Sequence, residues 1–86
     1  MSHRATRRFW KLYSALPAEA RQLASKSFSL LRTNPNHPSL RFKKVGSFMS
    51  ARVGLAYRAL AVPDGEDFTW VWIGPHDEYD RLINET

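Results

Sequence analysis

The sequence has no cysteine, and only four of its 86 residues are glycine. The absence of cysteine excludes a disulfide scaffold and a zinc site built from thiolates, and it suits a reducing compartment. No apolar run approaches the roughly 18–20 residues that a membrane-spanning helix needs. The first eight residues are polar and basic, unlike the apolar centre of a secretion signal. These absences predict a protein of the cytoplasm that does not enter a membrane.

Acidic residues are scarce in the first part of the chain. Residues 1–52 hold eleven Lys and Arg against the single acid Glu19, whereas the remaining 34 residues hold two Arg and seven acids. The net charge is therefore +10 in the first part and −5 in the second. This separation predicts a cationic surface, which attracts phosphate backbones, anionic lipid head groups or an acidic protein. The alternative is a charge that only keeps the protein in solution.

Apolar residues make up 43% of the sequence and aromatic residues 13%, which is enough for one core without cross-links. A chain of 86 residues buries a single modest core and has no residues left for a second. There is no internal repeat and no linker long enough to separate two domains. We therefore predict one domain over residues 1–86.

Two helices are predicted in the first third of the chain. Residues 4–15 combine helical spacing of apolar residues with basic residues between them. A second helix is predicted over residues 18–32, because Pro17 suits a helix start and apolar residues then recur every three or four positions. It ends before the segment 33–38, which is rich in proline and asparagine. The two helices are predicted to form a hairpin.

Beyond this loop the apolar period changes to two, which predicts strands. The first strand lies around residues 40–48, and a longer one covers residues 51–62. After a turn at 63–67, residues 68–73 are apolar on both faces, as in a central strand that is covered on both sides. Residues 75–84 are predicted to form a short helix with acids in its first turn. The predicted fold class is α+β.

Most aromatic residues follow these helical and strand periods and are therefore predicted to lie in the core. Tyr79, and secondarily Tyr57, are kept as candidate contacts to RNA. The aromatic residues assigned to the core are Phe9, Trp10, Tyr13, Phe28, Phe48, Trp70 and Trp72.

The strongest local signal is a set of cations on one sheet face. Arg52 and Arg58 are six residues apart, so on one strand they would share a face, and Arg41 and Lys43 would join them from a neighbouring strand. Like charges repel one another, and an anionic ligand compensates them; guanidinium groups match phosphate oxygens in a two-pronged geometry. The alternative is that these are ordinary solvated residues.

His76 follows the predicted central strand, at the start of the last helix. A histidine there can transfer protons near neutral pH, and Tyr79 lies one turn further, where it can stack on a base or hold a phosphate. The alternative is a surface histidine beside a core tyrosine. His76 and Asp80 have the spacing of two metal ligands, but no third ligand is evident, so no metal and no cofactor are predicted.

Four segments resemble the RelE/ParE toxin superfamily of bacterial toxin–antitoxin modules, and in particular its RelE-like and HigB-like branches. They are "ALPAEARQLASKSF", "NPNHPSLRFKKV", "ARVGLAYRALAV" and "VWIGPHDEYDRLI", and together they cover most of the chain. The resemblance implies two helices packed on a twisted, mainly antiparallel sheet of three to four strands, followed by a short helix. It also implies an active cleft on the other side of the sheet. The family's usual first strand is nearly absent, because residues 1–5 are short for one.

For function, the resemblance implies a toxin that cleaves mRNA on the ribosome and is neutralised by a cognate antitoxin in a hetero-oligomer. The family's cleft residues correspond to Lys43 or Lys44, to Arg58 after Tyr57, and to His76 and Tyr79. RNA carries its own nucleophile, the 2′-OH, so a metal-independent endoribonuclease needs only a base, an acid and cations. The resulting assignment makes His76, Arg58, Lys43 and Tyr79 catalytic. It makes Arg41, Lys44, Arg52, Arg7, Arg8 and Lys11 RNA-binding.

Two other functions stay open at this point. One is a toxin of the ParE branch, which would poison DNA gyrase and leave mRNA intact. The other is a passive basic module that binds RNA or the ribosome without chemistry. Clustered Lys and Arg together with His76 argue against the first, and loss of function on removing His76 or Arg58 would argue against the second.

Overall fold

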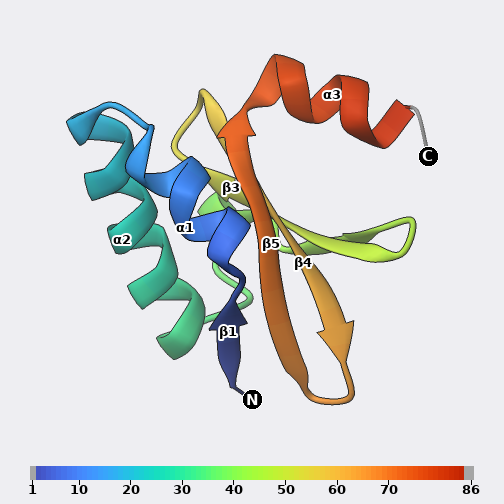
Figure 1. Cartoon of the computed structure of the whole chain (residues 1–86). Coiled ribbons are helices and arrows are strands. Elements are labelled where there is room, and N and C mark those ends of the chain that lie inside the picture. The colour runs from blue at the N-terminus through green and yellow to red at the C-terminus, as the bar shows by residue number, and fades with distance from the viewer. Residues whose placement is uncertain (1, 85–86) are drawn as a thin grey trace.

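A computed structural model describes residues 2–84 as one sheet with helices on both of its faces (Figure 1). Within these residues the sheet has five strands in the order β1-β5-β4-β3-β2. The strands are β1 (His3–Ala5), β2 (Lys43–Val45), β3 (Phe48–Val53), β4 (Tyr57–Asp64) and β5 (Asp67–Pro75). The helices are α1 (Arg7–Ser14), α2 (Ala18–Thr33), the short 3-10 helix η1 (Pro38–Leu40) and α3 (His76–Asn84). The predicted α+β class is confirmed. No helix of the described residues is long and apolar enough to cross a membrane.

The strand that we expected to be missing is present, so the sheet has five strands and not three to four. β1 pairs with β5 in parallel, with His3 opposite Phe68, whereas all other neighbouring strands are antiparallel. The strand ends at Ala5, and the next residue, Thr6, caps α1 because its side-chain oxygen accepts a hydrogen bond of 3.1 Å from the backbone N–H of Phe9. The helix predicted over residues 4–15 is therefore shorter and begins at Arg7.

The strand predicted over residues 51–62 is instead a hairpin. β3 ends at Val53, β4 begins at Tyr57, and Gly54 turns the chain with a φ of +62°. Because the apolar alternation continues in phase beyond the turn, periodicity alone did not separate the two strands. The strand predicted around residues 40–48 is also broken, since Leu40 belongs to η1 and Phe48 begins β3. The predictions for α2, β5 and α3 are confirmed to within two residues at each end.

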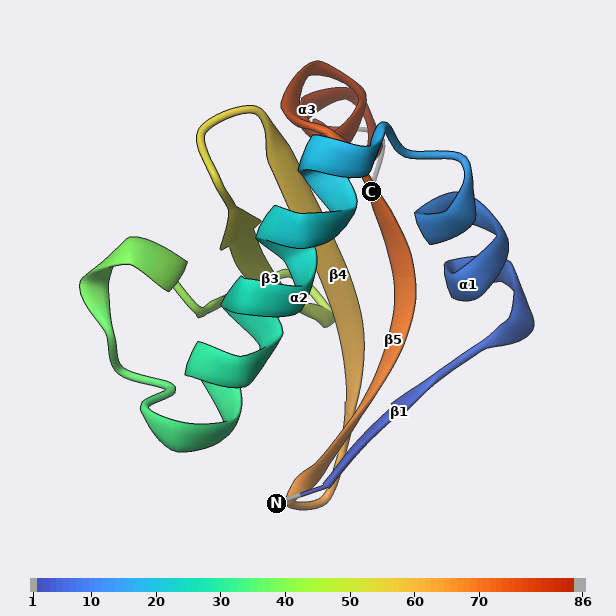
Figure 2. The same ribbon diagram turned by 90° about the vertical axis from the view of Figure 1, so that its left-hand side faces the viewer.

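Apolar clusters cover both faces of the sheet. On one face, α2 packs against β3 and β4 (Figure 2), and the buried residues include Leu31, Val53 and Ala59. On the other face, α3 packs against Leu60 and Trp72. The face that carries α3 is only partly covered by this helix. Arg52 and Arg58 lie on the same face as Leu60.

A bulge in β5 places side chains of this one strand in both apolar clusters. Leu60 pairs with Trp72, but the next residue, Ala61, pairs with Trp70, so Val71 is an extra residue in the ladder. Residues two apart on a regular strand point to the same face. Because of the bulge, Trp70 lies in the cluster under α2 and Trp72 lies in the cluster under α3.

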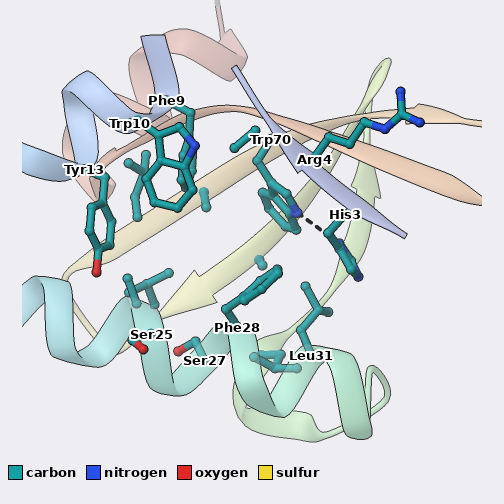
Figure 3. Close-up of a pocket in the computed structure, with 17 residues that line it drawn as sticks. His3, Arg4, Phe9, Trp10, Tyr13, Ser25, Ser27, Phe28, Leu31 and Trp70 are labelled. Atoms are coloured by element: carbon teal, nitrogen blue, oxygen red, sulfur yellow. Dashed lines mark hydrogen bonds between the residues drawn. The ribbon is translucent and has the colours of Figure 1, made fainter. Parts of the chain in front are cut away.

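The two N-terminal helices, which we predicted to form a hairpin, are joined by a short turn but do not pack closely along their length. α1 contacts mainly β5 and α2 contacts mainly β3, so a hollow remains between them (Figure 3). Two aromatic residues that we assigned to the core lie beside this hollow instead. Trp10 is 54% exposed and Phe28 is 39% exposed. Helical spacing correctly placed each ring on the inner side of its own helix. Both rings stay partly exposed because α1 and α2 are too far apart to cover each other's apolar side.

His3 joins β1 to the rest of the structure. Its ring lies against Phe28, Phe68 and Trp70, at centroid distances of 5.3, 5.5 and 6.1 Å. Its Nδ1 accepts a hydrogen bond of 3.0 Å from the indole N–H of Trp70, which requires that this nitrogen carry no proton. Burial, followed by repulsion from Arg32, lowers the pKa of His3 below its ordinary value of 6.5, while Asp67 acts in the opposite direction.

This environment predicts how stability depends on pH. A lowered pKa in the folded state means that the unfolded chain binds the His3 proton more readily, so the free energy of unfolding should fall as pH drops below 6.5. Above that pH the contribution of His3 is constant. Urea unfolding across this range should show a smaller decline for His3→Asn, which keeps an acceptor but does not titrate. Identical pH profiles for the two proteins would contradict this assignment.

Gly74 is predicted to be irreplaceable for packing under α3. A Cβ at this position would lie 2.6 Å from the ring of Trp72, closer than any real contact, so the indole would have to move. Overpacking of this kind typically costs about 1–3 kcal/mol. We expect Gly74→Ala to lower the free energy of unfolding by that order, measured by chemical denaturation, and an unchanged midpoint would show that Trp72 can move freely.

Candidate nucleic-acid interface

The candidate site is centred on two arginines that face each other across the β3–β4 hairpin. Arg52 lies directly opposite Arg58 in the strand register. Like charges in such a cross-strand pair destabilise the sheet. The two arginines therefore share a face, as predicted, although the hairpin and not a single strand brings them together.

The guanidinium of Arg58 is held by main-chain oxygens and not by an acid. Its Nη1 donates hydrogen bonds to the carbonyl oxygens of Tyr57, at 2.8 Å, and Leu55, at 3.3 Å. Burial, and then repulsion from Arg52, lower the pKa of Arg58 below its ordinary value, while Tyr79 and Asp80 act in the opposite direction. These carbonyls fix the position of a cation whose charge is left largely uncompensated.

Arg52 has an unsatisfied donor beside this pair. Its Nε is buried and has no hydrogen-bond partner within residues 2–84. A buried donor without a partner is uncommon and calls for a group from outside, such as water or an anion. A phosphate oxygen is an acceptor of the required kind and charge.

The register of β2 distinguishes its two lysines. Lys43 pairs with Ser50 and therefore shares the face of Arg52, whereas Lys44 pairs with Met49 on the opposite face. Arg41 precedes β2 in a left-handed conformation with a φ of +44°, and it is close enough to Arg58 to lower the pKa of that residue. The structure thus brings Arg41, Lys43 and the arginine pair together, and it places Lys44 apart from them.

His76 begins α3 at the same end of the sheet. Its backbone N–H donates a hydrogen bond of 2.8 Å to the carbonyl of Ala56, in the turn that precedes Arg58. Its side chain is 54% exposed, and Nδ1 lies 3.8 Å from Oδ2 of Asp80. The imidazole is therefore accessible to a ligand, on the helix whose Asp80 influences Arg58.

The two tyrosines are placed differently from our expectation. Tyr79 is only 6% exposed and packs against Trp72, with ring centroids 6.5 Å apart. Tyr57 is half-buried and packs against the cluster under α2, on the face away from Arg58. Neither ring is free to stack on a nucleotide while it stays packed. The catalytic role assigned to Tyr79 stays a prediction, since its side chain is close enough to Arg58 to influence the pKa of that residue.

The predicted cations of the first helix lie elsewhere. Arg7, Arg8 and Lys11 are exposed on α1, which packs against β5 (Figure 1). Lys43 and Arg52 belong to β2 and β3, at the other side of the sheet order. The cations of α1 form a second basic area and not part of the arginine site. No group of three metal-ligating side chains occurs within residues 2–84.

The hollow between α1 and α2 was missed by the sequence reasoning. It has a volume of about 320 Å³ and is lined by apolar residues of α1, α2, β1 and β5, which Figure 3 shows around Trp70 and Phe28. It lies on the helix-covered face, away from Arg52 and Arg58. The sequence indicates this space only through the small side chains of the alanines at positions 24, 51 and 59, which line it.

Comparison by sequence identifies no relatives, since no family model and no curated protein matches the chain. Comparison of folds does. A chain of the RelB–RelE antitoxin–toxin complex from Methanococcus jannaschii has a TM-score of 0.71 at 14% identity, covering 92% of this chain and 96% of that one. YafQ from E. coli strain BL21(DE3) has a TM-score of 0.69 at 13% identity, covering 90% and 94%. The isolated E. coli RelE toxin has a TM-score of 0.63 at 12% identity, covering 96% and 95%.

The chain therefore has the fold of RelE-like toxins, and the fold that the four segments predicted is confirmed. The similarity covers nine-tenths or more of each chain. Identities near 13% show a common fold and leave activity to be argued from the site itself.

The opposite faces of β2 give a matched test of the interface. Lys43→Ala should weaken binding of a fluorescently labelled oligoribonucleotide and reduce the slope of log K against log salt by about one, because one phosphate contact is lost. Lys44→Ala removes the same charge from the other face and should leave that slope nearly unchanged. Fluorescence anisotropy across a salt series measures both. Equal effects of the two substitutions would show that only total charge matters.

Proposed function

We propose that this protein is the toxin of a type II toxin–antitoxin module, and that it cleaves mRNA on the ribosome as a metal-independent endoribonuclease. The observation that carries the proposal is the cross-strand pair of Arg52 and Arg58, with an unsatisfied donor and with His76 exposed at the same end of the sheet. The RelE fold supports the toxin class. Action on ribosomes would place the protein in the cytoplasm.

The chemistry required is a transesterification within the RNA. The 2′-oxygen forms a bond to the neighbouring phosphorus and loses its proton to a base, and the bond from phosphorus to the 5′-oxygen breaks as that oxygen gains a proton. The products are a 2′,3′-cyclic phosphate and a 5′-hydroxyl. The phosphorane-like transition state carries extra negative charge, which preorganised cations stabilise.

Each role falls to a residue placed suitably for it. Arg58, fixed by the carbonyls of the turn, and Arg52 would stabilise the charge on phosphate. His76 would transfer a proton, since its imidazole is exposed and can act as an acid or a base. Lys43 and Arg41 would position the RNA backbone. Tyr79 would contribute by holding α3, and therefore His76, against Trp72.

Two partners follow from the proposal. The exposed cations of α1 would favour approach to ribosomal RNA by long-range attraction. A cell that makes such a nuclease must neutralise it, so we propose a cognate antitoxin and a hetero-oligomer with it. The fold shared with a chain of an antitoxin–toxin complex supports this partner.

Removal of either principal group should abolish most of the activity. We expect His76→Ala and Arg58→Ala each to reduce ribosome-dependent cleavage by at least about a hundredfold, the usual order for losing a proton-transfer group or an electrostatic stabiliser. Cleavage is measured on programmed ribosomes by primer extension, and circular dichroism checks that the variants fold. Arg81→Ala, an exposed arginine of α3, is the matched control.

Other outcomes distinguish the alternative functions. A 2′-deoxy nucleotide at the cleaved position should block the reaction, and product ends other than a cyclic phosphate and a 5′-hydroxyl would exclude the mechanism. Cells in which mRNA stays intact while DNA damage accumulates would indicate a gyrase-poisoning toxin instead. Full toxicity of both alanine variants would indicate a passive RNA-binding module.

A further inference from the structure

A separate pocket lies at the edge of the sheet, where β3 extends beyond its partner β2. Within residues 2–84, β2 pairs with β3 only from Phe48 to Ser50, and both α2 and η1 contact β3. The pocket between α2, η1 and the β3–β4 turn has a volume of about 290 Å³. This volume is close to the lower end of the range for small-ligand sites, which is about 300–1,000 Å³.

Leucine side chains form the apolar walls of this edge pocket and stay partly in water. Leu23 and Leu30 belong to α2, and Leu55 belongs to the turn. Leu55 is 80% exposed and Leu23 is 40% exposed. Enzymes that act on nucleic acids hold an unstacked base between aromatic or apolar side chains, and these leucines offer such surfaces.

The charged side chains that line the edge pocket are cations. Lys26 is exposed on α2, and Arg52 carries the buried Nε that has no hydrogen-bond partner within residues 2–84. No acid of the described part of the chain lines the pocket. A neutral ligand without an acceptor would leave the Nε of Arg52 unsatisfied, whereas a phosphate supplies both an acceptor and a compensating charge.

Ser39 of η1 presents an acceptor in the same pocket. Nδ1 of His37 accepts a hydrogen bond of 3.2 Å from the backbone N–H of Ser39, so this nitrogen carries no proton. The hydroxyl of Ser39 lies 2.8 Å from the same nitrogen and therefore donates to it, which leaves the hydroxyl oxygen as an acceptor for a ligand. A ribose 2′-OH is a donor of this kind, and it is the group that distinguishes RNA from DNA.

Arg52 connects the edge pocket to the arginine site, because it lines the pocket and also lies opposite Arg58. We propose that the edge pocket binds the nucleotide adjacent to the one whose phosphate lies on the arginine pair. Its base packs between Leu23 and Leu55, its phosphate lies between Lys26 and Arg52, and its 2′-OH donates to Ser39. The inference rests on the proposed function, since it assigns a further contact to the same RNA strand.

The test measures binding to the whole chain by fluorescence anisotropy. The probe is a labelled oligoribonucleotide of about five nucleotides, and the comparison strand has the same phosphates and riboses but no bases. The natural sequence should bind the probe at least about tenfold more tightly than the abasic strand, as expected when a base is held by side chains. Leu55→Ala should lose most of this preference, because only the strand with bases contacts that side chain. Val62→Ala, which shortens another exposed apolar residue, should keep it.

Two further variants separate the phosphate contact from the ribose contact. Lys26→Ala should weaken both strands equally and reduce the slope of log K against log salt by about one, whereas Arg81→Ala, on α3, should not. Ser39→Ala should reduce the preference for RNA over a 2′-deoxy strand of the same sequence. Ser39→Thr keeps the hydroxyl and should keep that preference.

Several results would overturn the proposal. Binding of the abasic strand as tightly as the probe, or an unchanged preference in Leu55→Ala, would show that no base occupies the pocket. Displacement of the probe by inorganic phosphate at equal concentration would reduce the pocket to a simple anion site. A nucleoside monophosphate that competes as well as the probe would identify a free nucleotide as the ligand, and a glutamate-rich peptide that does so would identify a protein.

Failure of this inference and failure of the proposed function give different results. If the natural sequence cleaves mRNA on ribosomes while Leu55→Ala keeps its preference for the strand with bases, only the edge pocket is wrongly assigned. If no cleavage occurs on ribosomes while the variants change binding as expected, the edge pocket holds a nucleotide and only the proposed chemistry fails. Absence of measurable binding to any oligoribonucleotide would overturn the assignment of the edge pocket.

Discussion

The carbonyl oxygens of residues 55–57 accept the hydrogen bonds that hold the arginine site together. Those of Leu55 and Tyr57 bind the guanidinium of Arg58, and that of Ala56 binds the backbone N–H of His76 where α3 begins. One tight turn thus fixes the Arg58 cation and the backbone of His76 relative to each other. Its geometry depends on Gly54, because the positive φ suits glycine and a Cβ there would lie 2.9 Å from Leu23 of α2.

The distribution of charge follows from the two faces of the sheet. The face under α2 is lined by apolar residues, whereas the other face is only partly covered by α3 and keeps its cations. Cations in the sheet repel each other, and main-chain oxygens offset this only in part. The folded chain therefore retains a local excess of positive charge that an anionic ligand would relieve.

Much of the fold could be predicted because its signals are local. The helical period of residues 18–32 and the apolar run 68–73 identified α2 and β5, and four segments identified the RelE fold. The break between β3 and β4 could not be predicted from the pattern, because the apolar alternation of Ala51 and Val53 stays in phase with that of Tyr57 and Ala59. β1 was missed because three residues carry too little pattern, and only its pairing with β5 makes it a strand.

The candidate site, too, could be predicted only in part from the sequence. Sequence spacing placed Arg52, Arg58 and Lys43 on one face correctly, even though it assumed the wrong strand. It left open whether Tyr79 lies in the core or contacts RNA, and only the packing against Trp72 shows that the ring is buried. The hollow was invisible for a related reason: periodicity indicates which side of a helix is apolar and does not indicate how far away the next helix lies.

The extra residue in β5 has a practical consequence for studying this protein in solution. Because Val71 shifts the ladder, the indoles of Trp70 and Trp72 lie in separate clusters on opposite faces of the sheet. Each indole is an intrinsic optical reporter of its own layer. Chains that keep only one of these tryptophans would reveal whether the α2 layer and the α3 layer melt together or in sequence, and therefore whether this sheet behaves as one cooperative unit or as two.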